Sequence, residues 1–255
     1  MEVSADTRLL VVIPVFGQHD YTRDIVADLA TQTYASFDVA IIDNGGDYCA
    51  TGTERVITPG ENLGWAAGSN RGFREGFSTG YSHVMTLNND TRISPHFIAG
   101  IMDPRLPDDA GIIAPLYDDH WPNQRTDYLG PAADYRPAQY YRRVPFVDGT
   151  CLTLTRAAFQ QVGVLDTQSF GTYSWGSDFH LCFRATLAGF GCYVTETSFM
   201  NHLGRKTAHS ITGRQRYWHR ATLGKKQGIR RTLGRKKWDD MANQEMTRIA
   251  FPTST

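Results

Sequence analysis

The first half of the chain alternates short apolar runs with segments of helical periodicity. Unbroken apolar runs at residues 9–13 and 39–42 are typical of strands buried on both faces of a parallel sheet, and apolar side chains recur at helical spacing over residues 20–31 between them. The alternation continues through strands and helices predicted at 55–57, 65–77, 84–87, 95–102 and 111–114. Serial strands and helices predict an α/β fold with a mostly parallel sheet and helices on both faces.

The second half is less regular. Periodicity fails over residues 118–143, which predicts an irregular insertion or a hairpin, and long loops of this kind often act as functional lids. A strand containing Gly149 is predicted over 144–155, followed by helices over 156–162 and 177–188. Three polar residues are the predicted helix N-caps, namely Asp20, Ser94 and Ser177.

Charge divides the chain at about residue 205. Residues 1–200 contain 13 arginines, no lysine and 23 acidic residues, a net charge of −10, whereas residues 201–240 contain 12 basic residues against Asp239 and Asp240, a net charge of +10. The zero net charge of the whole chain hides this asymmetry. We therefore predict an α/β domain over residues 1–205 and a basic, helical C-terminal extension over 206–255, interrupted by glycines into short helices.

Several common function classes are excluded by the motifs. The residues after the first strand, 14–18, contain no GxGxxG sequence, and no GxxxxGK[ST] loop exists in the chain, which argues against the usual NAD and P-loop sites. The four cysteines have no metal-ligand spacing and are expected to be reduced thiols of a cytoplasmic protein. No apolar run approaches the ~18–20 residues of a membrane span, and no signal peptide is predicted.

Acidic and amide side chains follow the predicted strands. Asp43 and Asp90 stand at strand carboxyl ends, where ligands bind in open α/β sheets. Asn88, Asn89 and Asp90 offer the hard oxygen ligands that Mg²⁺ and Mn²⁺ prefer. The same residue types are ordinary in turns, and Asp43 could equally be a turn cap, so both interpretations remain open.

Six motifs in register identify a family. They are VVIPV at 11–15, IIDN at 41–44, NLGWAAGSNRG at 62–72, TLNNDT at 86–91, VDGTCL at 147–152 and WGSDFHLCFR at 175–184. With His202 they cover about residues 8–205. This order resembles the family 2 glycosyltransferases with the GT-A fold, and is most similar to the branch that contains rhamnosyltransferases and galactofuranosyltransferases.

The resemblance implies an inverting, metal-dependent transfer of a sugar from a nucleotide-diphosphate sugar to a hydroxyl of a glycan, glycolipid or glycoprotein acceptor. Asp178 matches the general base, and Asp90 and His202 match ligands of the Mn²⁺ or Mg²⁺ ion. The residues that match the nucleotide and donor site are Pro14, Val15, Asp43, Asn62, Gly64, Asn70, Asn89 and Gly149. Tyr173 and Trp175 are candidates for stacking on the acceptor sugar, and a core role for Trp175 is equally open.

Three departures from the family pattern bear on this assignment. Asn88 stands at the first position of the metal-binding motif, Ser177 where Glu is usual, and His180 where Asp is usual. Asp178 could also be a helix N-terminal carboxylate that interacts only with the helix dipole. The alternative function is therefore a non-catalytic relative that binds sugar nucleotides or glycans.

The basic extension has several interpretations. Arg205 and Lys206 follow His202 closely enough to reach the donor diphosphate. Farther along, basic side chains interleave with aromatic and aliphatic ones, which is typical of a helix lying on anionic lipid, so peripheral contact with the inner face of the membrane is expected. A solvated or subunit-contacting face is the plainest alternative, and nucleic-acid binding is the least expected.

Overall fold

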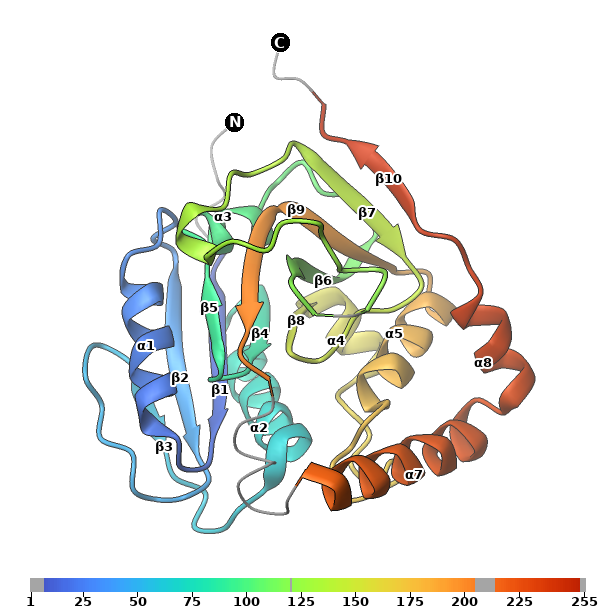
Figure 1. Cartoon of the computed structure of the whole chain (residues 1–255), viewed down its shortest axis with the longest axis horizontal. Coiled ribbons are helices and arrows are strands. Elements are labelled where there is room, and N and C mark those ends of the chain that lie inside the picture. Colours follow the sequence, from blue (N-terminus) through green and yellow to red (C-terminus); the bar gives the residue numbers. More distant parts are fainter. Residues whose placement is uncertain (1–6, 120, 205–213, 253–255) are drawn as a thin grey trace.

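A computed structural model describes residues 7–119, 121–204 and 214–252. Its strands form one ten-stranded sheet of order β10-β7-β9-β6-β8-β4-β1-β2-β3, with β5 paired to β9 (Figure 1). The strands are β1 (Leu9–Val15), β2 (Phe37–Asp43), β3 (Arg55–Ile57), β4 (His83–Leu87), β5 (Thr91–Ile93), β6 (Ala110–Tyr117), β7 (Tyr140–Val144), β8 (Cys151–Thr155), β9 (Gly191–His202) and β10 (Thr247–Ala250). The helices are α1 (His19–Ala30), α2 (Gly64–Ser78), α3 (Phe97–Ile101), α4 (Arg156–Val162), α5 (Ser177–Leu187), α7 (Arg214–Thr232) and α8 (Arg235–Ala242), with a 3₁₀ turn η1 (Ala132–Asp134).

Most strands of the sheet run in one direction. Parallel pairing joins β3, β2, β1 and β4, and it also joins β6 to β9. The antiparallel strands are β8, β7 and β5, so seven of the ten strands point the same way. The predicted α/β fold with a mostly parallel sheet is confirmed.

Strand β1 explains why the sheet carries helices on both faces. Its side chains alternate in direction, as the period of a strand requires. Leu10 and Val12 pack in a cluster with residues of α2, α4 and α5, whereas Leu9, Val11 and Ile13 pack in a second cluster with α1 and α3. Both sets are buried, which is why the strand appears in the sequence as an unbroken apolar run.

Glycines bring α2 close to the sheet. Gly68, Gly72 and Gly76 recur every four residues and so lie on one face of the helix. A Cβ atom on Gly72 would lie 2.3 Å from the Val12 Cγ1 atom, and one on Gly76 would lie 2.6 Å from a Val84 methyl carbon. No side chain fits at these positions without moving β1 or β4, so the glycines set the distance between helix and sheet.

We expect Gly72→Ala to destabilise the protein by about 1–3 kcal/mol, because the clash with Val12 outweighs the better helix propensity of alanine. The melting temperature should fall by roughly 3–10 °C, measured by circular dichroism. Arg71→Ala, one residue away on the exposed side of α2, is the control and should change stability by about 0.5 kcal/mol or less. An unchanged or raised melting temperature for Gly72→Ala would contradict this packing.

The strand predicted over 144–155 is wrong: two strands, β7 and β8, flank an irregular segment there. A turn at Asp148, whose Oδ1 accepts the Thr150 backbone N–H at 2.9 Å, interrupts the extended chain and leaves Gly149 outside both strands. Three further strands, β5, β9 and β10, were not predicted, and β7 falls almost wholly in the 118–143 segment, for which an irregular insertion or a hairpin was predicted. β9 escapes the apolar pattern because its middle, residues 195–198, is polar although buried.

The predicted N-caps are also wrong in detail. Helix α1 begins one residue before Asp20, α3 begins at Phe97, and Ser177 is the first residue of α5. Ser94 instead accepts the backbone N–H of Phe199 on its hydroxyl, which ties the start of this segment to β9. The residue that precedes α5 is Gly176, at φ 93°, a conformation that favours glycine.

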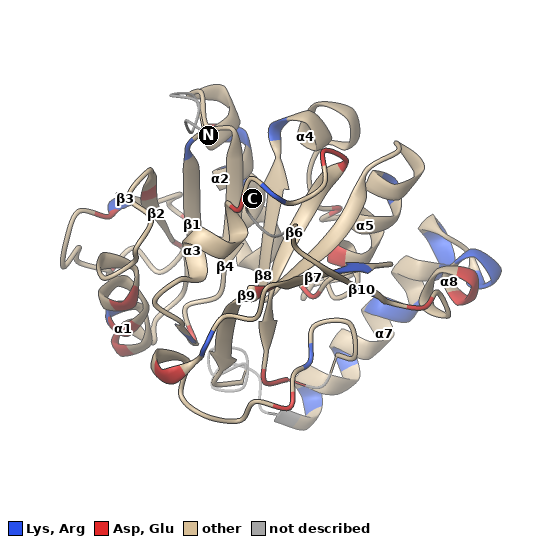
Figure 2. Cartoon of the chain, turned by 90° about the horizontal axis from the view of Figure 1, so that it is seen from above, with Lys and Arg blue, Asp and Glu red and all other residues tan. Residues whose placement is uncertain are grey.

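The C-terminal segment packs on the α/β body. Strand β10 pairs with β7, and α7 continues for 19 residues through two glycines that were expected to divide it into short helices. Cβ atoms on Gly224 and Gly228 would lie 2.5 Å from the Phe170 carbonyl oxygen and 2.2 Å from its ring, so these glycines are contact points rather than helix ends. Among the described residues, the segment after residue 205 therefore packs against the α/β body. Figure 2 shows Lys and Arg gathered on α7 and α8.

Candidate active site

The ends of β1 and β2 bring three predicted nucleotide-site residues together. Val15 pairs with Asp43 in the parallel register, and Pro14 lies beside them, 3.3 Å from the position of a Cβ on Gly68 of α2. The Asp43 carboxylate is buried and accepts three backbone N–H groups, from Gly45 at 3.1 Å, Gly46 at 2.9 Å and Tyr48 at 3.0 Å. Asp43 therefore caps the turn after β2, the plainer of the two roles considered from the sequence.

The loop that enters α2 holds the next predicted donor residues. Asn62 accepts the Gly64 backbone N–H at 2.9 Å, and Gly64 has φ +73°, which closes a tight turn at the helix start. The Asn70 side chain is directed at Leu165 and not at this loop. Its amide bonds the backbone of Leu165 twice, as donor at 2.8 Å and as acceptor at 2.9 Å, and so joins α2 to the segment before α5.

The end of β4 and the end of β9 place Asp90 beside His202. Thr91 and His202 are register partners in β5 and β9, and the Asp90 carbonyl accepts the Leu203 N–H at 2.9 Å. The His202 Nε2 atom lies 3.6 Å from Asp90 Oδ1. Asn89 turns away toward α1, where its amide donates to the Thr22 hydroxyl at 3.0 Å.

Two further carboxylates hold His202. Asp119 Oδ2 lies 3.0 Å from His202 Nδ1, and Asp118 Oδ1 accepts the His202 backbone N–H at 2.8 Å. Burial lowers the pKa of His202, but its contacts with Asp119 and Asp90 outweigh burial and raise that pKa to about 9. These two aspartates begin the 118–143 segment, and the sequence carried no signal that they face a residue more than eighty positions away.

The Asp90 and His202 pair fits a divalent metal in donor chemistry. Imidazole nitrogen and carboxylate oxygen suit Mn²⁺, and the buried Nε2 atom of His202 has no hydrogen-bond partner among the described residues. Asp119 holds the opposite ring nitrogen, as outer carboxylates commonly do for metal-binding histidines. Over the described residues, no three His, Cys, Asp or Glu side chains converge on one metal position.

Asp178 lies in the first turn of α5 and is directed at Gly149. Its Oδ2 accepts the Gly149 N–H at 2.8 Å and its Oδ1 accepts the Phe179 N–H at 3.0 Å. A Cβ on Gly149 would lie 2.5 Å from the Trp65 ring and 3.3 Å from Asp178 Oδ2, so only glycine fits between them. Burial, together with the charge of Asp148, raises the pKa of Asp178 to about 7. A carboxyl with that pKa is suited to exchange protons near neutral pH.

A family model matches more than half of this chain. The sequence profile described as "Glycosyl transferase family 2" matches residues 10–163. The uncharacterised proteins Mb1552 of Mycobacterium bovis and MT1576 and Rv1525 of Mycobacterium tuberculosis are each 49% identical to this chain over 226 residues, 89% of this chain and 85% of theirs. The chain belongs to glycosyltransferase family 2.

Two solved structures show the same fold at 12% sequence identity. The mannosyltransferase PcManGT from Pyrobaculum calidifontis, solved in complex with GDP-Man and Mn²⁺, has a TM-score of 0.60 over 92% of this chain and 67% of that chain. GalNAc-T7, solved with UDP, GalNAc and Mn²⁺, has a TM-score of 0.58 over 78% of this chain. The present chain spans 44% of GalNAc-T7. The GT-A fold predicted from the sequence is confirmed.

The two departures on α5 have structural partners in this family 2 glycosyltransferase. The Ser177 hydroxyl donates to the Ser174 carbonyl at 2.7 Å and is fully buried. His180 Nδ1 lies 3.7 Å from Asp166, and burial lowers its pKa. Neither residue adds a negative charge beside Asp178, so the environment of the candidate base differs from the pattern usual in the family.

The aromatic residues before α5 contact α7. The Trp175 Nε1 donates to the Tyr217 hydroxyl at 2.9 Å, and the Trp175 ring meets the Trp218 ring edge-on at a centroid distance of 4.9 Å. Tyr173 meets Tyr217 edge-on at 4.7 Å. Both predicted acceptor residues are therefore in one aromatic cluster with the basic helix of the glycosyltransferase.

Lys225 is a residue of this site whose place the sequence analysis missed. Its Nζ lies over three aromatic rings close to Asp178, while the neighbouring Lys226 is exposed. The signal was present: Lys225 falls in the i, i+4 row of Tyr217, Ala221, Ile229 and Leu233, which are all buried. A lysine in the buried row of an amphipathic helix faces the protein body, whereas lysines on the exposed side of the helix face solvent. Arg205 and Lys206, expected at the diphosphate, lie outside the described residues.

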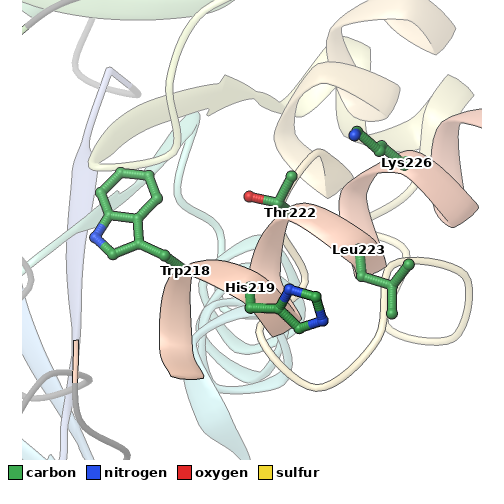
Figure 3. A pocket seen from close by; sticks show the side chains of 5 residues that line it. All are labelled: Trp218, His219, Thr222, Leu223 and Lys226. Atoms are coloured by element: carbon green, nitrogen blue, oxygen red, sulfur yellow. The ribbon is translucent and has the colours of Figure 1, made fainter. Parts of the chain in front are cut away.

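A shallow hollow lies on α7 itself. It measures about 330 Å³ and is lined by Trp218, His219, Thr222, Leu223 and Lys226, which Figure 3 shows along the helix. It contains none of the residues predicted for the donor, the metal or the base. In the part of the chain that the structure describes, no helix has the length and apolarity needed to cross a bilayer.

Proposed function

We propose that this glycosyltransferase is an inverting, metal-dependent enzyme that moves a sugar from a nucleotide-diphosphate sugar to an acceptor hydroxyl, with Asp178 as the general base. The observation that carries the proposal is the Asp178 carboxyl itself. It is buried at a helix start, aimed at Gly149 of the 145–150 loop, and has a pKa raised to about 7. A base of this kind can accept a hydroxyl proton at neutral pH.

The proposed chemistry is a single displacement. Asp178 takes the proton of the acceptor hydroxyl as its oxygen bonds to the anomeric carbon, and the bond between that carbon and the diphosphate oxygen breaks on the opposite face. One displacement inverts the configuration of the anomeric carbon. The N–H groups of Gly149 and Phe179 fix the carboxylate in one orientation, which restricts the positions that the acceptor oxygen can take.

Asp90 and His202 are the proposed metal ligands, for Mn²⁺ or Mg²⁺. Such an ion, when bound, neutralises charge that builds on the departing diphosphate. Asp119 holds the His202 ring so that Nε2 is directed toward Asp90. The donor's diphosphate would complete the coordination that the protein side chains leave open.

The proposed donor site follows the strand ends. Pro14, Val15 and Asp43 receive the nucleotide's base and ribose, and Asp43 retains acceptor capacity beyond its three backbone bonds. Asn62, Gly64 and Gly149 line the donor side. Asn70 and Asn89 act indirectly, since their amides hold α2 and α1 in place.

The acceptor is proposed to be a glycan, glycolipid or glycoprotein, approached through Tyr173 and Trp175. The donor and acceptor sugars would be those of the rhamnosyltransferase and galactofuranosyltransferase branch. Exposed basic residues on α7 and α8 fit a peripheral contact with anionic lipid on the cytoplasmic side, where a lipid-linked acceptor is presented. These residues include Arg216, Arg220, Arg230, Arg231 and Lys236.

A thermal-shift panel of nucleoside diphosphates and their sugars, with and without Mn²⁺, tests the donor site. We expect the matching nucleotide at about 100 times its Kd to stabilise the fold by about 2.7 kcal/mol, a rise in melting temperature of roughly 5–10 °C. The rise should depend on Mn²⁺ or Mg²⁺ and disappear with EDTA. A panel in which no nucleoside diphosphate raises the melting temperature would reject the proposal.

The second candidate function is a non-catalytic binder of sugar nucleotides or glycans. The observation that favours it is that Ser177 and His180 leave Asp178 without neighbouring acids on its own helix turn. A binder and an enzyme both respond in the thermal-shift panel. Release of nucleoside diphosphate from the stabilising donor in the presence of Mn²⁺ occurs only with the enzyme.

A further inference from the structure

Lys225, the half-buried lysine of α7, passes directly beside the start of α5. A Cβ on Gly176 would lie 3.3 Å from the Lys225 Cγ atom, so the aliphatic stem of Lys225 packs over the residue that precedes α5. Asp178 follows two residues later. Gly224 packs on the Phe170 carbonyl oxygen, and this contact sets the distance between α7 and the segment that contains Phe170. The position of Lys225 is thus set by backbone contacts on both sides.

Three aromatic rings hold the ammonium group. Its Nζ lies 4.5 Å from the ring centroid of Phe179, 4.7 Å from that of Trp121 and 5.4 Å from that of Trp238. The rings come from α5, the segment after β6 and α8, so three separate parts of the chain converge on one cation. An aromatic cage stabilises a cation without neutralising it, and the charge remains available to carboxylates nearby.

Two carboxylates interact with that charge. Burial lowers the pKa of Lys225, whereas attraction to Asp178 and Asp148 raises it. Asp148 of the 145–150 loop raises the pKa of Asp178 and Lys225 of α7 lowers it, and Cys182 of α5 also interacts with Asp178. Lys225 is the cation of this set. It opposes the effect of Asp148, which by itself would favour a protonated Asp178.

We propose that Lys225 is a positioning residue for the transferase reaction, whose caged ammonium offsets the charge of Asp148 and keeps Asp178 in its carboxylate form. This inference rests on the proposed function of Asp178 as the base. It gives the basic helix two roles on two sides: the inward lysine acts on the site, and the outward basic residues face solvent.

The test compares Lys225→Met with Lys226→Met, two adjacent variants that lose the same charge from the buried and the exposed side of α7. Activity should rise with pH through the pKa of Asp178, because the base acts only when deprotonated. We expect Lys225→Met to move this acidic limb of kcat/KM upward by about one pH unit. Activity should fall about tenfold at pH 6 and return close to the wild-type value at pH 9, whereas Lys226→Met should follow the wild-type profile.

Two additional variants and one further measurement keep the test decisive if Lys225→Met folds poorly. Lys225→Arg retains the charge and should retain the wild-type limb, and Asp148→Asn should move the limb downward. Carboxyl ¹³C NMR of aspartate-labelled protein reads the Asp178 titration without substrate, its resonance being assigned by its loss in Asp178→Asn.

The outcomes are distinguishable. An unmoved limb and an unmoved Asp178 titration in Lys225→Met, or an equal shift in Lys226→Met, would overturn the role of Lys225. Equal loss of activity at every pH would also overturn it, because that pattern belongs to a purely structural residue. Full activity of Asp178→Asn would instead reject the proposed function, whatever the lysine variants show.

Discussion

Replacing Asp178 with asparagine is expected to reduce kcat by about 10²–10⁴-fold, the range associated with removing a general base. Asparagine has the size of aspartate but only one side-chain oxygen, so it can accept the N–H of Gly149 or that of Phe179 and not both. The melting temperature of the variant should therefore be measured beside its activity. The amide cannot take a proton from the acceptor hydroxyl at neutral pH. Initial rates of nucleoside diphosphate release measure the loss, and donor-induced thermal shifts should remain near the wild-type value.

The matched control is Asp134→Asn in η1, which removes one exposed carboxylate far along the chain from α5. It should leave kcat within about twofold of the wild-type value. Retained turnover in Asp178→Asn would show that another group accepts the proton. A parallel loss of donor binding in that variant would show instead that Asp178 acts on the donor rather than on the acceptor.

The second large loss of activity is expected when the Asp90 charge is removed. Asp90→Asn should lower activity by about 100-fold or more at moderate Mn²⁺ concentration, because a carboxylate ligand is lost from the site that supports the departing diphosphate. Isothermal titration of Mn²⁺ in the presence of nucleoside diphosphate should show weakened binding. Excess Mn²⁺ should recover only part of the activity.

Asp119→Asn separates direct from indirect contributions. Asp119 contacts the opposite ring nitrogen of His202 and so orients the ligand without being one in this proposal. Its loss should weaken Mn²⁺ binding by about 10–100-fold, with activity returning at saturating metal. Equal, fully metal-rescued behaviour of Asp90→Asn and Asp119→Asn would remove Asp90 from the ligand set.

The spacing of apolar residues predicted the helices and strands whose formation depends on the local sequence alone. The runs at β1 and β2 and the helices α1, α2 and α4 follow from burial on both sheet faces and from helical spacing. β9 could not be predicted in this way, because residues 195–198 are buried polar side chains. Their polar atoms form hydrogen bonds with one another and with neighbouring segments of the same chain, as in the 2.6 Å contact between the Thr195 and Thr197 hydroxyls.

The residues of the candidate site were likewise predictable only in part. Motif order grouped Asp90 with His202 as metal ligands and named Asp178 and Gly149 as separate site residues. The structure brings both pairs together, because these residues lie at element ends that meet in the fold. Asn70 and Asn89 matched the motif and yet have side chains bonded to Leu165 and Thr22. Lys225, Asp118 and Asp119 depend on contacts between distant segments, for which spacing along the chain gives no rule.

The paired arginines on Glu196 connect strand β10 to the edge of the sheet. Glu196 is buried and accepts Arg142 Nε at 2.7 Å and Arg248 Nε at 2.9 Å, and both contacts lower its pKa. Arg248 lies in β10, so this carboxylate gains its second cation only when β10 pairs with β7. Until then β7 is an unprotected sheet edge that invites pairing with other chains. Truncation ahead of residue 247 would therefore cost solubility as well as stability.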